Sequence, residues 1–331
     1  MSEMFSALLT TEQAGQYQTA LVQRRLDELP PGEVLIRVQW SSMNYKDALS
    51  ASGNKGVTRQ YPHTPGIDAA GQVVSDDSGT FAEGTAVLVT GYDLGMNTAG
   101  GYGEYIRVPA SWVVRLPDSL GAREAMLLGT AGLTAGLCVQ ALLDSGVTPE
   151  DGEVLVTGAT GGVGSLSVAL LAHLGFSVVA ATGKDDAHDW LKASGAASCV
   201  GREALADAGR PMLKPRWAGA VDTLGGEPLA SVIKSTAYGG SVACCGLAAS
   251  TDLPLSVFPF ILRNVRLLGV DSVEQPLAVK AAIWQRLATD WRLPQLEQVL
   301  AEEVSLQALP GWFERILAGG VRGRVLVRVS G

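Results

Sequence analysis

The stretch VLVTGATGGVG, residues 154–164, decides the fold of this chain. Residues 153–157 have the apolar character of a buried strand, and residues 164–174 are apolar at helical spacing. The glycines between them follow the spacing G-x-x-G-x-x-G, a variant of G-x-G-x-x-G. Such a turn lets a pyrophosphate approach the backbone, and the start of the helix offers free N–H groups and a partial positive charge. The pattern predicts a dinucleotide site; glycines used only for close packing are the alternative.

Strands and helices continue to alternate after this turn. Residues 177–182 predict a second strand, Asp185 is placed to cap the next helix, and residues 220–223 and 241–245 predict further strands. Alternating strands and helices are typical of an α/β fold with a doubly wound parallel sheet.

The end of the second strand indicates which nicotinamide cofactor binds. An NAD site usually carries an acidic residue there, about 20 residues after the glycine turn. Here the chain reads Thr182-Gly183-Lys184, and Arg202 follows the next predicted strand. A hydroxyl, a glycine and two cations suit a 2′-phosphate, so the sequence predicts NADPH. Solvated surface charges are the other interpretation of Lys184 and Arg202.

The flanking segments have a different pattern. Residues 1–125 are predicted to be β-rich, because short apolar stretches alternate with Gly, Pro, Asn and Asp turns. A helix is predicted over residues 124–143, although its glycines weaken that prediction. Two helices and a closing strand near the chain end are expected to return to the first domain. We therefore predict a β-rich domain at 1–125, a nucleotide-binding domain at 126–265 inserted into it, and a returning segment at 266–331.

Composition excludes several classes of protein. The chain has 331 residues and a formal net charge of -8, which argues against nucleic-acid or anionic-membrane partners. The N-terminus does not resemble a secretory signal, and no uninterrupted apolar stretch is long enough to span a bilayer. No C-x-x-C pair occurs among the four cysteines, so we expect free thiols and a cytoplasmic location.

Histidines and cysteines are too sparse for a zinc site. Catalytic zinc needs three converging His, Cys or carboxylate ligands. The chain has only His63, His173 and His188, and no cysteine precedes Cys138. We expect no metal. Polarising an alcohol or aldehyde is difficult without a Lewis acid, whereas a double bond already activated by a carbonyl is easier to reduce.

The run Asn44-Tyr45-Lys46-Asp47 follows a predicted strand and supplies the candidate catalytic residues. Tyr45 could stack on a nicotinamide or donate a proton, and Asn44 could orient a ribose or a carbonyl. The alternative is a helix start capped by Asn44, with Asp47 in the first turn. Asp68 is expected to bond backbone N–H groups at a turn.

Together these features resemble the zinc-free, quinone oxidoreductase-like members of the medium-chain dehydrogenase/reductase superfamily, and more closely the acryloyl-CoA reductase branch. The resemblance covers essentially the whole chain. It rests on residues 40–47 (WSSMNYKD), 65–68 (PGID), 129–132 (GTAG), the glycine turn, residues 182–184 (TGK) and residues 260–272 (FILRNVRLLGVDS). The family's glycine turn often carries Ser where this chain has Thr160, which keeps the hydroxyl.

The resemblance implies a GroES-like β-rich catalytic domain, an inserted Rossmann domain that binds NADPH, and a homodimer joined near the end of the nucleotide-domain sheet. Tyr45 and Asn44 remain the candidate catalytic residues, and Lys55 and Arg59 are weaker candidates for contacts to CoA phosphates. The resemblance also implies cofactor contacts from a larger set: Tyr45, Thr130, Thr160, Gly161, Gly162, Val163, Thr182, Gly183, Lys184, Arg202, Leu247, Ile261, Ser272 and Arg324.

Three functions remain open on the sequence. The first is NADPH-dependent reduction of acryloyl-CoA or a related short-chain enoyl-CoA. The second is reduction of quinones or free enones on the same fold. The third is a non-catalytic NADPH-binding protein with a structural or sensing role. The intact run at 44–47 favours an enzyme over the third.

Overall fold

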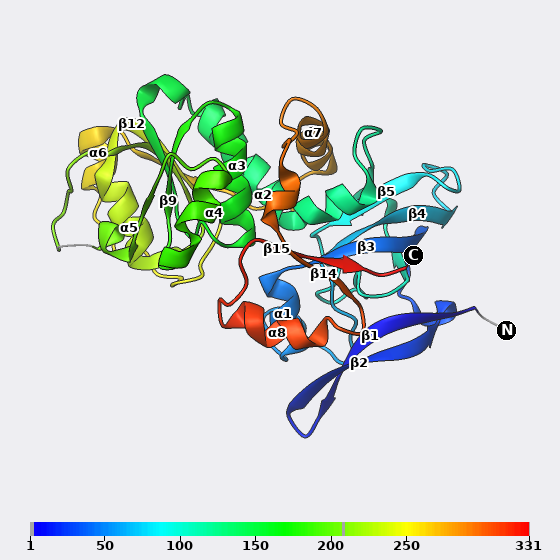
Figure 1. Cartoon of the computed structure of the whole chain (residues 1–331). Helices are drawn as coiled ribbons and strands as arrows, with labels where there is room; N and C mark the ends of the chain where they lie inside the picture. Colours follow the sequence, from blue (N-terminus) through cyan, green and yellow to red (C-terminus); the bar gives the residue numbers. More distant parts are fainter. Residues whose placement is uncertain (1–2, 207–208, 331) are drawn as a thin grey trace. The chain divides into compact units, whose positions relative to one another are not determined.

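A computed structural model describes residues 3–206 and 209–330. They form two compact units (Figure 1). Unit 1 comprises residues 3–130, 272–289 and 300–330, and unit 2 comprises residues 131–271 and 290–299. The expected boundaries at 125/126 and 265/266 differ from these by about half a dozen residues. The predicted returning segment at 266–331 also included residues 290–299, whereas in the structure these residues belong to unit 2.

Unit 2 is a doubly wound parallel sheet, as predicted. Its six strands have the order β10-β9-β8-β11-β12-β13. The chain starts in the middle at β8, runs outward through β9 and β10, then crosses back to β11, so the strand order reverses between β8 and β11. Ligands of such sheets bind at the carboxyl ends of the strands beside this reversal. The strands are β8 (Glu153–Val156), β9 (Ser177–Ala181), β10 (Ser198–Val200), β11 (Trp217–Asp222), β12 (Thr236–Cys244) and β13 (Arg266–Gly269).

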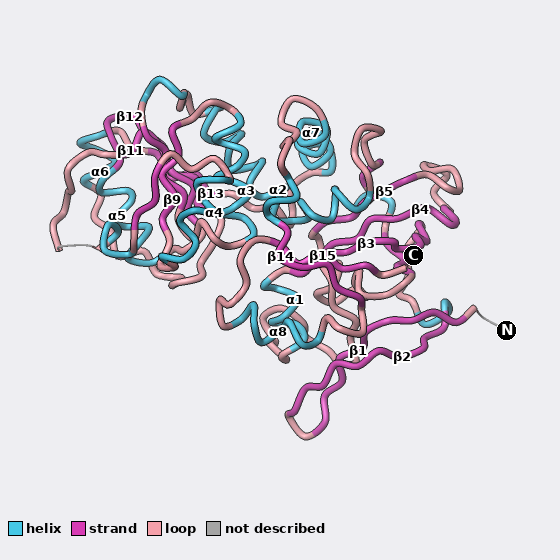
Figure 2. The backbone as a smooth tube through the Cα atoms, in the orientation of Figure 1, coloured by secondary structure: helices cyan, strands magenta, loops and turns pink. Residues whose placement is uncertain are grey.

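Helices pack around this sheet, and Figure 2 shows how they alternate with its strands. The central strands are buried on both faces, which explains their continuous apolar sequences: Val154, Leu155 and Val179 are fully buried. The helices are α3 (Gly162–His173), α4 (His188–Ala193), α5 (Gly226–Ser235) and α6 (Phe258–Arg263).

Unit 1 is built on a seven-stranded, mostly antiparallel sheet. Its path is β14-β15-β3-β4-β5-β7, with β6 paired to β3, and a separate hairpin joins β1 to β2. The closing strand β15 pairs with β3 in the register Leu326↔Ser42, so the end of the chain does return to the β-rich domain. The strands are β1 (Met4–Gln13), β2 (Gln16–Arg25), β3 (Val34–Met43), β4 (Asp68–Asp76), β5 (Ala86–Thr90), β6 (Tyr105–Val108), β7 (Val114–Arg115), β14 (Leu300–Ser305) and β15 (Arg324–Arg328).

Three helices complete unit 1. They are α1 (Tyr45–Ala51), α7 (Leu277–Ala288) and α8 (Pro310–Leu317), and α1 packs against α8. Residues 112–116 belong to the segment predicted to be β-rich, but only Val114–Arg115 forms a strand there. A 3₁₀ turn, Ala110–Trp112, precedes this strand of only two residues, and Pro109 and Pro117 limit pairing on either side.

Helix α2 (Ala122–Asp144) begins in unit 1 and ends in unit 2. It is long and apolar enough to span a membrane by length and composition, but most of its residues are buried inside the protein, as expected of a core helix. Gly129 breaks it with a φ of 55° and a ψ of -157°. A Cβ at Gly129 would lie 2.5 Å from Ser42 Oγ and 2.6 Å from Asp68 Oδ2, so only glycine fits the kink.

Candidate functional site

The glycine turn lies at the carboxyl end of β8, where the strand order reverses. Gly161 precedes the first residue of α3 in extended backbone conformation, so the first N–H groups of α3 have no partner within the helix. A Cβ at Gly164 would lie 2.3 Å from the carbonyl oxygen of Gly158, so the helix can approach the turn this closely only with glycine there. Thr160 is 7% exposed and lies within the turn. The turn therefore has the free donors and the small residues that a pyrophosphate needs.

Two cations lie at the neighbouring strand ends of unit 2. Strands β9 and β10 are paired through Ala181 and Val200, so Lys184 and Arg202 follow adjacent carboxyl ends. The Arg202 side chain lies over Gly183, since a Cβ there would be 2.3 Å from Arg202 Nε. Thr182 is buried, and its Oγ1 accepts the backbone N–H of Lys184 at 3.1 Å. The hydroxyl, the glycine and both cations are thus brought to one corner of the sheet.

The other predicted cofactor contacts of unit 2 are more scattered. Leu247 follows the carboxyl end of β12 and is 65% exposed. Ile261 lies on α6, where 69% of its surface is exposed. These two, like Ser272 in unit 1, stay predictions.

Unit 1 contains a buried polar network centred on Asp68, the first residue of β4. Its Oδ2 accepts Ser42 Oγ at 2.5 Å, Asn44 Nδ2 at 2.7 Å and the backbone N–H of Thr130 at 2.9 Å. Its Oδ1 accepts Thr130 Oγ1 at 2.6 Å. The Thr130 N–H is a backbone donor of the kind expected for Asp68, whereas the other three of its four donors are side chains. Asp68 thereby joins the end of β3 to the kink in α2.

Arg324 belongs to the same network. It is 3% exposed, and its guanidinium donates from Nη1 to Asn44 Oδ1 at 3.1 Å and to the Met43 carbonyl at 3.2 Å. Nε donates to the Leu127 carbonyl at 3.2 Å. Nη2 is buried and has no hydrogen-bond partner among the residues that the structure describes. Within unit 1, the Arg324 guanidinium therefore bonds the Asn44 amide oxygen and two backbone carbonyls.

Tyr45 is the first residue of α1 and is 52% exposed. Its hydroxyl makes no hydrogen bond within the described residues, so it is free to meet a ligand. Asn44 precedes it in extended conformation, and the Asn44 backbone N–H donates to Asp47 Oδ2 at 2.8 Å. Asp47 thus lies in the first turn of the helix, as the sequence suggested, while the Asn44 side chain is held by Asp68 and Arg324.

Asp47 is fully enclosed beneath this helix start. It accepts the N–H of Asn44, the N–H of Ile67 at 2.9 Å and the hydroxyl of Tyr102 at 2.9 Å. Burial, and secondly the charge of Asp68, raise the pKa of Asp47 from 3.8 to about 6, against the opposing effect of these hydrogen bonds.

The raised pKa predicts how stability depends on pH. The native protein retains the proton of Asp47 at a pH where the unfolded chain has released it. The contribution of Asp47 to stability is thus fully present below pH 3.8 and is lost as pH rises through 6. Between these two limits, the contribution of Asp47 to the free energy of unfolding changes by on the order of 3 kcal/mol. Urea denaturation at pH 4.5 to 7.5 should show wild type gaining stability relative to Asp47→Asn as pH falls. A difference that does not change with pH would contradict this.

Lys55, a weak candidate for a CoA contact, has partners within unit 1. Its Nζ forms an ion pair with Glu12 at 2.9 Å and lies 4.6 Å from the centre of the Tyr61 ring. Arg59 is exposed and stays a weak candidate. Within residues 3–206 and 209–330, no group of three or more His, Cys, Asp or Glu side chains could hold a metal ion.

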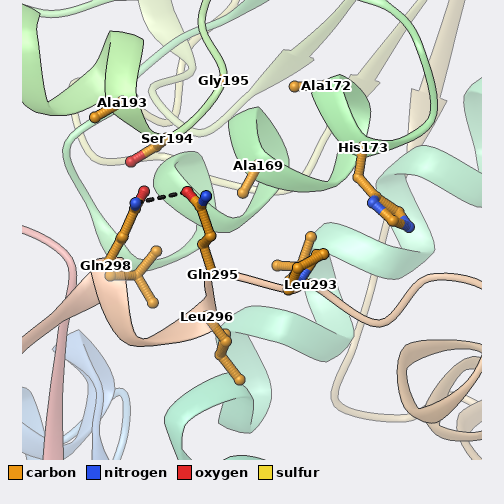
Figure 3. Close-up of a pocket in the computed structure, with 12 residues that line it drawn as sticks. Ala169, Ala172, His173, Ala193, Ser194, Gly195, Leu293, Gln295, Leu296 and Gln298 are labelled. Carbon is orange, nitrogen blue, oxygen red and sulfur yellow. Dashed lines mark hydrogen bonds between the residues drawn. The ribbon is translucent and has the colours of Figure 1, made fainter.

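A separate cavity of about 200 Å³ lies in unit 2 at the C-terminal ends of α3 and α4 (Figure 3). Ala172, Ser194 and Leu296 are among its lining residues, and Gln298 donates to Gln295 at 2.6 Å beside it. The glycine turn is at the N-terminal end of α3, so this cavity is not the expected dinucleotide site.

Comparison with known proteins agrees with this architecture. Residues 30–118 match the alcohol dehydrogenase GroES-like domain, and residues 162–288 match the zinc-binding dehydrogenase domain. The probable acrylyl-CoA reductase AcuI of Escherichia coli is 48% identical over 98% of this chain and 99% of its own length. The acrylyl-CoA reductase AcuI of Ruegeria pomeroyi is 46% identical, and the putative quinone oxidoreductase YhfP of Bacillus subtilis is 45% identical, each over 99% of this chain and all of the relative.

Two solved structures of relatives have the same fold as this chain. Escherichia coli YhdH with bound NADPH has a TM-score of 0.94 at 47% identity, covering 98% of this chain and all of that one. Bacillus subtilis YhfP with bound NAD has a TM-score of 0.96 at 45% identity, covering 99% of this chain and all of that one. The chain belongs to the medium-chain dehydrogenase/reductase superfamily, in the branch that includes the acrylyl-CoA reductases. The expected GroES-like and Rossmann domains are confirmed.

Proposed function

We propose that this chain reduces the carbon–carbon double bond of acryloyl-CoA to give propanoyl-CoA, with NADPH as the hydride donor. The observation that carries the proposal is near-full-length similarity, at 46% and 48% identity, to two relatives named as acrylyl-CoA reductases. The cation pair of unit 2 supports the choice of NADPH, and the run at 44–47 supports catalysis over a purely structural role.

The residues of unit 2 fit the proposed cofactor. The glycine turn would hold the pyrophosphate by the free N–H groups of α3, and Lys184 and Arg202 would hold the 2′-phosphate. Bound NADPH would supply a hydride.

The residues of unit 1 fit the substrate side of this reaction. The thioester carbonyl withdraws electrons from the double bond, so C3 accepts hydride and negative charge builds on the thioester oxygen. Hydrogen-bond donors that are already in position stabilise such charge. Asn44 and Tyr45 are our candidate donors, and a proton then reaches C2 from Tyr45 or from water.

Quinone or free-enone reduction is the second candidate, since the Bacillus subtilis relative is named as a putative quinone oxidoreductase. A panel of acryloyl-CoA, crotonyl-CoA, a quinone and a free enone separates the two. We expect the highest kcat/KM for acryloyl-CoA, with activity unchanged by metal chelation. A quinone turned over far faster would replace the proposal with the second candidate. No turnover of any of them would favour a non-catalytic NADPH-binding protein.

We also propose a homodimer that forms at the β13 edge of the unit 2 sheet, in a cytoplasmic protein with free cysteines. The residues beside this edge are exposed and apolar, including Ile261, Leu262 and Leu267. We expect sedimentation at micromolar concentration to give twice the chain mass of 34.5 kDa. The double variant Leu262→Asp, Leu267→Asp should shift it to the monomer. A wild-type monomer would contradict the proposal, as would a dimer that survives both aspartates.

A further inference from the structure

We propose that Asp68 and Arg324 are positioning residues that fix the orientation of the Asn44 amide, so that Asn44 presents an N–H to the oxygen on which charge builds. The inference rests on the proposed reduction of an activated double bond, and it gives Arg324 a role other than cofactor contact.

Both ends of the Asn44 amide are held by groups that cannot exchange roles. Nδ2 donates to the Asp68 carboxylate at 2.7 Å, and Oδ1 accepts from the Arg324 guanidinium at 3.1 Å. A guanidinium has no acceptor, and a carboxylate oxygen has no proton to donate. Rotating the amide by half a turn would set its NH₂ against the guanidinium and its oxygen against the carboxylate. Only one of the two amide orientations therefore satisfies both neighbours.

This orientation determines what Asn44 offers to a ligand. Nδ2 donates to Asp68 at 2.7 Å and has a second contact with Ser42 Oγ of 3.5 Å, which is long for a hydrogen bond. Nδ2 can therefore still offer an N–H to a ligand, on a side chain that is only partly buried. Arg324 donates a charge-assisted bond to the amide oxygen, which draws electron density from the nitrogen and makes the remaining N–H a stronger donor.

The two positioning residues are themselves fixed. Thr130 donates to Asp68 from both its backbone N–H and its hydroxyl, and the Met43 and Leu127 carbonyls hold Arg324. Asp68 and Arg324 are both enclosed, with 0% and 3% of their surface exposed. The donor is thus in place before any substrate binds, which is the condition for electrostatic stabilisation without reorganisation.

Arg324→Lys tests the proposal, because lysine keeps the charge but cannot reproduce the three bonds of the guanidinium. Arg328→Lys is the matched control, since Arg328 lies on the same strand and is exposed. Activity is measured with whichever member of the substrate panel the wild type reduces fastest, so failure of the acryloyl-CoA assignment does not affect this test. We expect Arg324→Lys to lower kcat about 10- to 100-fold. The NADPH Kd should change less than about twofold, and the control should match wild type.

A double-mutant cycle separates positioning from general structural damage. If Arg324 acts through Asn44, then Arg324→Lys should lower kcat less than about threefold once Asn44→Ala is present. Independent, multiplicative losses would overturn the proposal. A rise in NADPH Kd of tenfold or more with kcat unchanged would also overturn it and return Arg324 to the cofactor.

The wild-type protein provides a second test should Arg324→Lys fail to fold. The Asn44 side-chain amide is assigned by NMR as the asparagine resonance that disappears in Asn44→Ala. We expect one of the two Nδ2 protons to exchange with solvent much more slowly than the side-chain amide protons of an exposed asparagine, because Asp68 holds it. Exchange of both Nδ2 protons at the rate of an exposed asparagine would overturn the proposal.

Discussion

Replacing Lys184 with alanine is expected to weaken NADPH binding by about 1.5–3 kcal/mol, which is roughly 10- to 150-fold in Kd. Lys184 follows β9, beside Arg202 on the adjacent strand end, so its ammonium would form a charge-assisted bond with the 2′-phosphate. NADH has no such phosphate, and its Kd should barely change. Fluorescence titration of both cofactors measures the two effects in one protein.

Lys192→Ala is the matched control for this experiment, because Lys192 is an exposed lysine on α4 of the same unit. It should leave both dissociation constants at the wild-type level. Equal losses for NADPH and NADH in Lys184→Ala would refute the phosphate assignment. The affinity for NADH is worth measuring beside that for NADPH, because a relative at 45% identity has been crystallised with NAD.

Tyr45→Phe is expected to lower turnover on the order of 100-fold while NADPH affinity stays unchanged. The Tyr45 side chain is half exposed at the start of α1 and bonds no described residue, so removing its hydroxyl should not damage the fold. Its loss would remove a donor to the thioester oxygen, or the proton for C2.

Stopped-flow absorbance at 340 nm follows cofactor oxidation in single turnovers and so isolates the chemical step of Tyr45→Phe. Tyr238→Phe is the control, since Tyr238 is a tyrosine of unit 2 that is 78% exposed, outside the proposed site. An unchanged single-turnover rate in Tyr45→Phe would contradict a chemical role for the hydroxyl.

The parts of the fold that could be predicted are those specified by local sequence. The glycine turn lies between β8 and α3, as its spacing predicts, and the strand predicted over residues 177–182 is β9, Ser177–Ala181. The β1–β2 hairpin carries no strong turn signal in its sequence. Its turn residues Ala14 and Gly15 both have positive φ, and alanine is an unusual residue for that conformation, so the usual Asn-Gly or Asp-Gly signal is absent.

The polar network of unit 1 could not be predicted in the same way. Asn44, Asp68, Thr130 and Arg324 are spread over 281 positions of the chain and meet only when β15 pairs with β3 and α2 kinks at Gly129. The sequence indicated each residue separately, as a helix cap, a turn residue or a cofactor contact. The available signal was the glycine at 129, since a buried glycine inside an apolar helix often marks a close approach of other groups.

Transfer of deuterium from labelled NADPH to the acyl group tests the central claim most directly. Acryloyl-CoA is incubated with the enzyme and with NADPH carrying deuterium at either of the two C4 positions, and the propanoyl-CoA is analysed by NMR and mass spectrometry. The account predicts that one of the two labelled cofactors delivers a single deuterium to C3 and that the other delivers none. Failure to form propanoyl-CoA, or propanoyl-CoA without deuterium at C3 from either cofactor, would contradict it.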